Sequence, residues 1–248
     1  MTLKDKTALI TGGGTGLGAD LARGFAEAGA KVWIAGRTSA TLDKLADSHR
    51  NIHAVVADVT DETSVGAMFD FTGPADIVIA NAGASVSAPL TRTTTQDWDA
   101  MLAVNLTGTF LTFRAALRRM KGLDWGRLIA VASTAGIKGY PYVPAYCAAK
   151  HGVIGLTRSA ALENASGGIT VNALSPGFLD TEMTDRSIAN IMAKTAMSAA
   201  DARGNLERMS PQNRLIQPAE VTAAALWLCG PGSEGITGQA ISISGGEV

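Results

Sequence analysis

The chain has 248 residues, and its 21 Lys and Arg against 22 Asp and Glu leave a formal net charge of −1. This balance excludes a broad basic surface for nucleic acid or for an acidic membrane, since either surface needs an excess of basic residues. The length is sufficient to bury a sizeable core, and no Pro-, Ser- or Gly-rich linker divides the chain. We therefore expect a single domain over residues 1–248.

The cysteines, the histidines and the apolar runs narrow the class of protein further. The two cysteines give no disulfide framework, and the three histidines lack the spacing of metal ligands, so we expect no structural metal. No uninterrupted apolar run reaches the ~18 residues of a transmembrane helix, and the N-terminus has no cleavable signal. These features indicate a soluble protein of a reducing compartment, the cytoplasm.

Short apolar, β-branched runs alternate along the chain with longer amphipathic stretches. Such runs suit a parallel sheet that is covered on both faces. Leu17, Leu21 and Phe25 show the helical spacing between two of them. The alternation predicts an α/β doubly wound (Rossmann) fold in three layers, with a parallel sheet of about seven strands. The predicted strands are Thr7–Thr11, Lys31–Ala35, His53–Ala57, Asp76–Ala80, Arg127–Ala132, Ile169–Leu174 and Ala240–Ile243.

One connection is much longer than the others, and it covers residues 178–215. It holds four of the eight methionines, Met183, Met192, Met197 and Met209. A long segment near a ligand site is often a lid, and methionine gives such a lid an adaptable apolar lining. The alternative is a pair of helices that pack on the core with incidental methionines.

A glycine-rich turn, Thr11–Gly18, joins the first predicted strand to the first helix. Glycines at such a turn let the backbone approach a pyrophosphate, and the N-terminus of the following helix offers free N–H groups to it. The position of the turn predicts dinucleotide binding. Its glycines at 12, 16 and 18 follow the spacing G-x-x-x-G-x-G, which differs from G-x-G-x-x-G and indicates a particular branch of these folds.

The end of the second predicted strand distinguishes between NAD and NADP. An acidic residue at this place accepts hydrogen bonds from the ribose hydroxyls of NAD, but here the sequence has Arg37 and no carboxylate. A guanidinium pairs well with a 2′-phosphate, so we favour NADP, with NAD as the alternative.

A tyrosine and a lysine, Tyr146 and Lys150, are spaced to lie on one face of a helix. A nearby ammonium lowers the pKa of a phenol and makes it a usable acid or base. The hydroxyl of Ser133 could hold a carbonyl oxygen beside that phenol, and the amide of Asn105 could orient a water next to Lys150. Without Ser133 and Asn105, the ordinary explanation of a Tyr–Lys pair at this spacing is an exposed helix face.

Taken together, these motifs resemble the short-chain dehydrogenase/reductase family over the whole chain. The ordered motifs are T-G-x-x-x-G-x-G at Thr11–Gly18, Asp58-Val59, Asn81-Ala82-Gly83, Asn105, Ser133, Tyr146-x-x-x-Lys150 and Ser175-Pro176-Gly177. The resemblance implies that Tyr146 is the general acid or base, that Ser133 orients the reacting oxygen and that Lys150 holds the nicotinamide ribose. It also implies that Asn105 supports a water relay from Lys150 to solvent.

The resemblance also implies most of the cofactor contacts. Asp58 and Val59 would meet the adenine, Asn81–Gly83 its ribose, and Pro176–Thr181 the nicotinamide carboxamide. The full expected set is Gly12, Thr15, Gly16, Leu17, Gly18, Arg37, Asp58, Val59, Asn81, Ala82, Gly83, Tyr146, Lys150, Pro176, Gly177, Leu179 and Thr181. One departure is Ala80, which stands where the family has a first asparagine, and we expect a small structural effect from it. A second is the connection 60–75, which is about one helical turn shorter than usual.

The implied reaction interconverts a secondary alcohol and a ketone. The sequence near Val171–Thr184 is similar to 3-oxoacyl-thioester reductases and polyketide ketoreductases, so we expect an apolar ketone or a 3-oxoacyl derivative. A sugar or polyol dehydrogenase is the alternative within the family, and a non-catalytic dinucleotide-sensing protein is the alternative from another class. The resemblance also implies a homotetramer. The small residues Ala148, Ala149, Gly152 and Gly155 suit such an interface, but they suit packing within one chain equally well.

Overall fold

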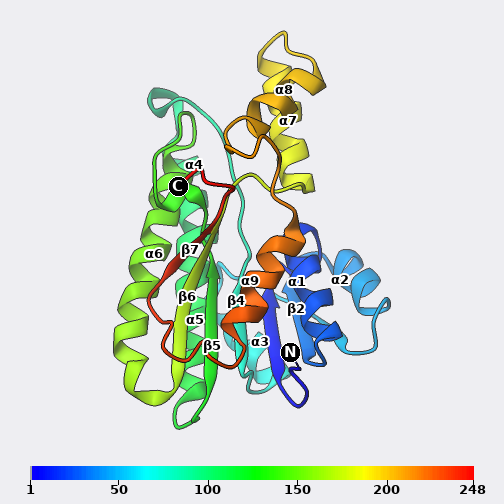
Figure 1. Cartoon of the computed structure of the whole chain (residues 1–248), viewed down its shortest axis with the longest axis vertical. Helices are drawn as coiled ribbons and strands as arrows, with labels where there is room; N and C mark the ends of the chain where they lie inside the picture. Colours follow the sequence, from blue (N-terminus) through cyan, green and yellow to red (C-terminus); the bar gives the residue numbers. More distant parts are fainter. Residues whose placement is uncertain (1) are drawn as a thin grey trace.

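The computed structural model describes residues 2–248, and its centre is one parallel sheet with the strand order β3-β2-β1-β4-β5-β6-β7 (Figure 1). The strands are β1 (Thr7–Thr11), β2 (Lys31–Gly36), β3 (Ile52–Val56), β4 (Ile77–Ala80), β5 (Gly126–Val131), β6 (Ile169–Pro176) and β7 (Ala240–Ile243). The α-helices are α1 (Gly16–Glu27), α2 (Ser39–Ala46), α3 (Glu62–Thr72), α4 (Thr95–Leu102), α5 (Gly108–Met120), α6 (Pro144–Asn164), α7 (Glu182–Lys194), α8 (Ala199–Glu207) and α9 (Pro218–Leu228). The expected doubly wound fold in a single domain is confirmed.

The strands begin and end within two residues of their predicted limits, and the apolar runs of the central strands β1, β4, β5 and β6 are buried. The central strand shows this most clearly, since Ile10 of β1 pairs with Ile34 of β2 on one side and with Ile79 of β4 on the other. All three isoleucines are fully buried. The order of the strands reverses between β1 and β4, and a ligand of such a sheet binds beyond the carboxyl ends of the strands at that point.

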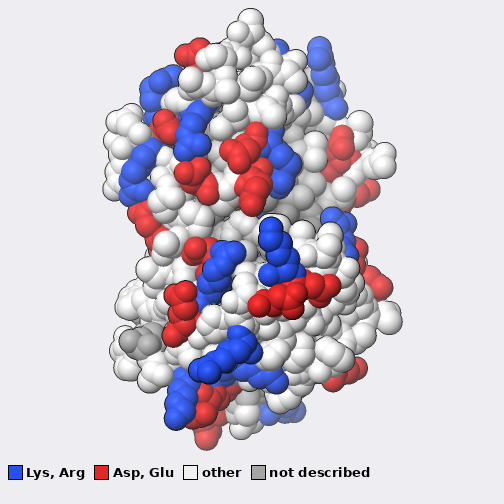
Figure 2. Space-filling view, turned by 90° about the vertical axis from the view of Figure 1, so that its right-hand side faces the viewer, with Lys and Arg blue, Asp and Glu red and all other residues white. Residues whose placement is uncertain are grey.

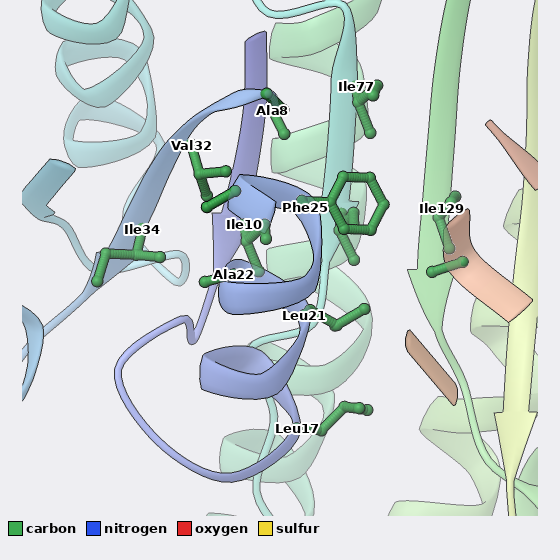
Figure 3. Close-up of a cluster of buried hydrophobic side chains, with 14 of the residues drawn as sticks. Ala8, Ile10, Leu17, Leu21, Ala22, Phe25, Val32, Ile34, Ile77 and Ile129 are labelled. Atoms are coloured by element: carbon green, nitrogen blue, oxygen red, sulfur yellow. The ribbon is translucent and has the colours of Figure 1, made fainter. Parts of the chain in front are cut away.

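Two apolar clusters, one on each face of the sheet, hold the three layers together. Helices α1, α2 and α9 pack on one face, where Leu17, Leu21 and Phe25 of α1 form one buried cluster with Ile10, Ile34 and Ile77 of the strands (Figure 3). Helices α3, α5 and α6 pack on the other face through Met68, Phe113 and Val153, among others. Burial of one such side chain stabilises the fold by about 2 kcal/mol. The two clusters therefore fix the strand ends that form the site.

Helices α4 and α5 are joined by a π-helical segment, η2 (Ala103–Thr107), into one helical stretch, Thr95–Met120. By length and composition this stretch could cross a membrane, with a mean hydropathy of 1.3 over its most apolar window. Half of that window is buried inside the fold, and Leu111 and Phe113 belong to the core. Core helices of globular domains pass the same test, so this helix is not a clear membrane span.

Helices α7 and α8 lie beyond the carboxyl ends of the strands, away from the main layers (Figure 1). They carry a small apolar cluster of their own, formed by Ile188, Ala202, Leu206 and Leu215. On the face of the molecule in Figure 2, acidic and basic side chains are interspersed. Residues 2–248 contain no group of three or more Asp, Glu, His or Cys side chains that could hold a metal ion.

Candidate active site

The predicted site residues follow five different strands at the same edge of the sheet. The glycine turn follows β1, Arg37 follows β2, Asp58 follows β3, Asn81 follows β4 and Ser133 follows β5. In a parallel sheet all of these carboxyl ends meet at one edge. The fold therefore brings together residues that lie far apart in the chain.

The glycine turn has backbone angles and contacts that a larger residue could not adopt. Gly12 and Gly16 have φ values of +64° and +51°, in the left-handed region that favours glycine. A Cβ on Gly18 would lie 2.0 Å from the carbonyl oxygen of Gly12. Gly12 and Gly16 thus give the turn its shape. Gly18 lets the first turn of helix α1 pack directly on the Gly12 carbonyl.

A reciprocal set of hydrogen bonds between Thr11 and Asn81 holds this turn against the end of β4. The Thr11 hydroxyl accepts from the backbone N–H groups of Asn81 and Ala82, at 3.1 Å each. The Asn81 amide donates to the carbonyl oxygens of Thr11 and Gly12, at 2.9 and 3.1 Å. The Asn81 side chain therefore braces the turn, and its predicted contact with the cofactor would be made by its backbone.

The start of α1 has the properties of an anion site. The side chain of its first flanking residue, Thr15, makes no capping hydrogen bond, and the first turn has no acidic residue. Free N–H groups and the positive end of the helix dipole are therefore available to a phosphate. A cleft of about 650 Å³ opens beside this turn, and its lining includes Gly14, Thr15, Gly16 and Thr181 together with the carboxylates of Asp20, Asp180, Glu182 and Asp185. The free N–H groups at the start of α1, rather than the whole cleft, fit the pyrophosphate of a dinucleotide.

Arg37 and Asp58 lie beyond this turn, at the ends of β2 and β3. Arg37 is exposed and has no ion-pair partner within 4.0 Å among residues 2–248. Hydrogen bonds from the backbone and hydroxyl of Thr60 lower the pKa of the Asp58 carboxyl, and the charge of Arg37 adds to this effect. The Arg37 guanidinium is thus free to meet an anionic group of a ligand.

Segment 176–181 lies at the other end of the site, after β6. The Gly177 N–H donates to the Ile243 carbonyl at 3.0 Å, and Leu179 forms an isolated parallel bridge with Ile216. Thr181 then precedes α7, and its side chain lies close to Gly16 of the glycine turn. This contact brings the predicted nicotinamide loop next to the predicted pyrophosphate turn.

Helix α6 carries Tyr146 and Lys150 one turn apart, as expected from their spacing. The Lys150 side chain is almost fully buried, and its ammonium donates to the Val131 carbonyl at 2.7 Å. The same ammonium lies 5.6 Å from the centre of the Tyr146 ring. The hydrogen bond to β5 thus fixes how the tyrosine faces the strand ends.

The two side chains have shifted pKa values. Burial raises the pKa of the Tyr146 phenol, and a hydrogen bond with Ser133 opposes this rise. Burial lowers the pKa of Lys150 from 10.5 to about 8. Loss of hydration dominates the pKa of Tyr146, so the net shift in this structure is upward, opposite in direction to the lowering expected from Lys150.

Asn105 lies in the π-helical segment η2 and is fully buried. Its amide donates to the carbonyl oxygens of Ala84 and Met101, at 2.9 and 3.0 Å. A Cβ on Gly83 would lie 2.7 Å from Asn105 Oδ1 and 3.7 Å from Lys150 Nζ. The glycine therefore leaves the space in which Asn105 and Lys150 approach each other. Single π-helical turns inside α-helices occur frequently at functional sites.

Ser133 begins a short 3-10 turn, η3 (Thr134–Gly136), directly after β5. Its hydroxyl accepts a hydrogen bond from the Ala135 N–H at 3.1 Å. The turn packs closely on α6, since a Cβ on Gly136 would lie 2.6 Å from the Lys150 carbonyl oxygen. This close packing fixes Ser133 relative to the helix that carries Tyr146.

A polar cluster beside this turn was not predicted from the sequence. Tyr140 contacts Thr134 and Glu247, and Lys138 forms an ion pair with Glu247. Tyr140 and Glu247 are 107 residues apart, and no local pattern connects them. The only sequence signal is the closeness of Tyr140 to Ser133 and Tyr146 along the chain.

The buried ammonium of Lys150 gives a prediction for stability. Its lowered pKa means that the folded protein bears the cost of burying the charge below about pH 8, and that this cost disappears as pH rises toward 10.5. Lys150→Met should therefore raise the free energy of unfolding at pH 7 by about 2 kcal/mol, after subtraction of the lost hydrogen bond to Val131. The gain should shrink between pH 8 and pH 10.5.

Denaturant unfolding at a series of pH values measures this effect. Lys121→Met is the matched control, because Lys121 is exposed, and it should change stability by less than about 0.5 kcal/mol. A destabilised Lys150→Met protein at pH 7, or a gain that grows above pH 8, would contradict the prediction.

Known proteins with similar sequences and structures agree with this arrangement. The family model described as "short chain dehydrogenase" matches residues 6–191. The D-beta-hydroxybutyrate dehydrogenase of Rhizobium meliloti (strain 1021) is 35% identical over 253 residues, covering 97% of this chain and 98% of that protein. The 3-oxoacyl-[acyl-carrier-protein] reductase FabG of Aquifex aeolicus (strain VF5) is 32% identical over 253 residues, covering 98% of each.

Among solved structures, a single-substitution variant of actinorhodin polyketide ketoreductase with NADPH superimposes with a TM-score of 0.93 at 31% identity, covering 100% of this chain and 99% of that chain. The family match, the fold and the cluster of Asn105, Ser133, Tyr146 and Lys150 are mutually consistent. This chain belongs to the short-chain dehydrogenase/reductase family and is an oxidoreductase of CH–OH and keto groups that uses a nicotinamide dinucleotide.

Proposed function

We propose that this chain catalyses the NADP(H)-dependent interconversion of a ketone and a secondary alcohol, with an apolar ketone or a 3-oxoacyl compound as the substrate. The observation that carries the proposal is that Ser133, Tyr146, Lys150 and Asn105 gather at one edge of the sheet, where β5 pairs with β6, the strand that precedes the predicted nicotinamide loop. Similarity to a 3-oxoacyl-[acyl-carrier-protein] reductase and to a polyketide ketoreductase supports this substrate class.

In the reductive direction, Tyr146 donates its proton to the carbonyl oxygen of the substrate. A tyrosine phenol is protonated at neutral pH, so Tyr146 carries the proton that this step needs. Burial raises the pKa of this phenol and makes it a weaker acid, and the hydrogen bond with Ser133 opposes that rise. Ser133 donates a hydrogen bond to the same oxygen and holds it beside the phenol. The bound nicotinamide supplies the hydride that reduces the carbonyl carbon.

Lys150 and Asn105 return a proton to Tyr146 after the reaction. The pKa of Lys150, about 8, lets its ammonium release and regain a proton near neutral pH. Asn105 fixes the space beside Lys150 through its two hydrogen bonds to backbone carbonyls, which suits a water that connects the ammonium to solvent. Lys150 also holds the nicotinamide ribose.

The segment 178–215 covers the substrate side of this site. Asn190 of α7 donates to the Ser87 hydroxyl at 2.7 Å, and Lys194 donates to the Ser87 carbonyl at 3.2 Å. These bonds connect α7 to the loop after β4, across the carboxyl ends of the strands. We assign this segment the role of a lid over the substrate. We also propose that the enzyme is cytoplasmic.

Tyr146→Phe tests the proton transfer. This change removes the donor and keeps the ring, so kcat should fall by about two to four orders of magnitude while the affinity for NADPH stays within about threefold. Steady-state kinetics on a panel of ketones and alcohols, with NADPH fluorescence for binding, measures both quantities. Tyr142→Phe is the control, because Tyr142 is exposed, and it should retain normal turnover.

Undiminished turnover in Tyr146→Phe would remove this residue from the mechanism. Binding of NADPH by the unaltered protein without turnover of any carbonyl or alcohol would instead favour a dinucleotide-sensing protein.

Arg37→Ala tests the choice of cofactor. Loss of the charge-assisted contact with a 2′-phosphate should raise KM for NADPH by about tenfold to a hundredfold and leave KM for NADH nearly unchanged. Arg50→Ala is the control, since Arg50 is exposed and precedes β3 at the opposite edge of the sheet. A native enzyme that clearly prefers NADH would refute the assignment of NADP.

We also propose a homotetramer, joined through the helices α5 and α6. The exposed side chains of Phe110 and Leu162 on these helices suit a buried interface. Light scattering at working concentration should give four times the mass of one chain, and a monomer would overturn this part of the proposal.

A further inference from the structure

Glu247 is a nearly buried carboxylate at the edge of the site. Its side chain is only 2% exposed, although it follows the last strand in a short tail. Figure 1 shows that this end of the chain lies at the same end of the molecule as α7. Glu247 Oε1 accepts from the Tyr140 hydroxyl at 2.5 Å and from Lys138 Nζ at 3.0 Å. A buried carboxylate is costly unless such donors satisfy it.

The carboxylate determines the direction of the hydrogen bonds around Tyr140. A phenol has one hydrogen, and an ionised carboxylate can only accept, so the Tyr140 hydrogen goes to Glu247. The Thr134 hydroxyl, 2.6 Å from the Tyr140 oxygen, then acts as the donor in their contact. Thr134 directly follows Ser133, so the chain of bonds from Glu247 ends at the turn that positions Ser133.

The same carboxylate also contacts the segment that follows β6. Glu247 Oε2 lies 3.3 Å from the position of a Cβ on Gly177, and Phe178 comes next in the chain. The Tyr140 ring meets the Phe178 ring edge-on, with centroids 6.3 Å apart and an angle of 85° between the planes. Lys138 Nζ lies 5.0 Å from the centroid of the same Tyr140 ring. Tyr140 is therefore held at its hydroxyl by Glu247, and its ring is contacted by Phe178 and Lys138.

We propose that Glu247 is a positioning residue, whose carboxylate fixes Tyr140 against Phe178 as one wall of the substrate site. The inference rests on the proposed ketone reduction, because the wall matters only if a substrate binds between Ser133, Tyr146 and the lid. Lys138 pairs with the carboxylate, so this wall consists of two aromatic rings and an ion pair with no net charge. Such a wall suits an apolar ketone.

The kinetic test uses Glu247→Ala, Glu247→Gln and Tyr140→Phe. Glu247→Ala should raise KM for the ketone about tenfold, the equivalent of one charge-assisted hydrogen bond, and leave kcat within about twofold. Glu247→Gln keeps an acceptor and should recover part of the loss. Glu247→Ala combined with Tyr140→Phe should be no worse than either change alone, because both remove the same contact.

Glu27→Ala is the matched control, since Glu27 is exposed at the end of α1, and it should leave both constants unchanged. A normal KM in Glu247→Ala, or full additivity in the double variant, would overturn the proposal. A fall in kcat at constant KM would overturn it as well, because that result places the effect of Glu247 on the turn of Ser133 and not on the substrate wall.

A second measurement does not depend on turnover. The chain has three tyrosines, so 3-fluorotyrosine labelling gives three ¹⁹F signals that Tyr→Phe variants can assign. In Glu247→Ala the Tyr140 signal should move toward that of the exposed Tyr142, while the Tyr146 signal shifts much less. An unmoved Tyr140 signal would refute the proposal that Glu247 holds Tyr140, even in an active enzyme. If the unaltered protein reduces no carbonyl, the proposed function fails, and the ¹⁹F spectrum still decides whether Glu247 holds Tyr140.

Discussion

The hydrogen bond from the buried Lys150 ammonium to the Val131 carbonyl fixes helix α6 on the carboxyl end of β5. Tyr146 lies one turn earlier on that helix, and Ser133 lies two residues beyond Val131. This one bond therefore sets the position of Tyr146 relative to Ser133. The close approach of Gly136 to the Lys150 carbonyl adds a second constraint on the same pair of elements. The bond therefore offsets part of the cost of burying a charge at a place where the geometry of the site depends on it.

The sheet could be predicted from the sequence, and so could the meeting of the candidate site residues at one of its edges, for a simple physical reason. Strands that are buried on both faces have continuous apolar runs, and the turns at their carboxyl ends need glycine or a capping side chain. Thr7–Thr11 and Ala240–Ile243 are found as predicted, and the Tyr146–Lys150 spacing places both residues on one helix. Local signals of this kind persist in the fold because the sheet brings all the strand ends to one edge.

Other features could not be predicted because they arise from contacts between distant segments. The π-helical turn around Asn105 depends on packing between η2 and α6, and nothing in Ala103–Thr107 marks it. The pKa of Tyr146 follows from burial, which the i, i+4 spacing with Lys150 does not reveal. The brace between Asn81 and Thr11 likewise connects two strands that are 70 residues apart.

The late position of Glu247 in the chain affects the order in which the site is completed during synthesis. The glycine turn, the Thr11–Asn81 brace and the ends of β2 and β3 all lie within the first 83 residues, and Tyr146 and Lys150 follow by residue 150. Chains emerge from the ribosome N-terminus first. The segments to which we assign the dinucleotide therefore emerge before the residue that we propose holds Tyr140 in place. On this proposal, the substrate wall is the last part of the site to be synthesised.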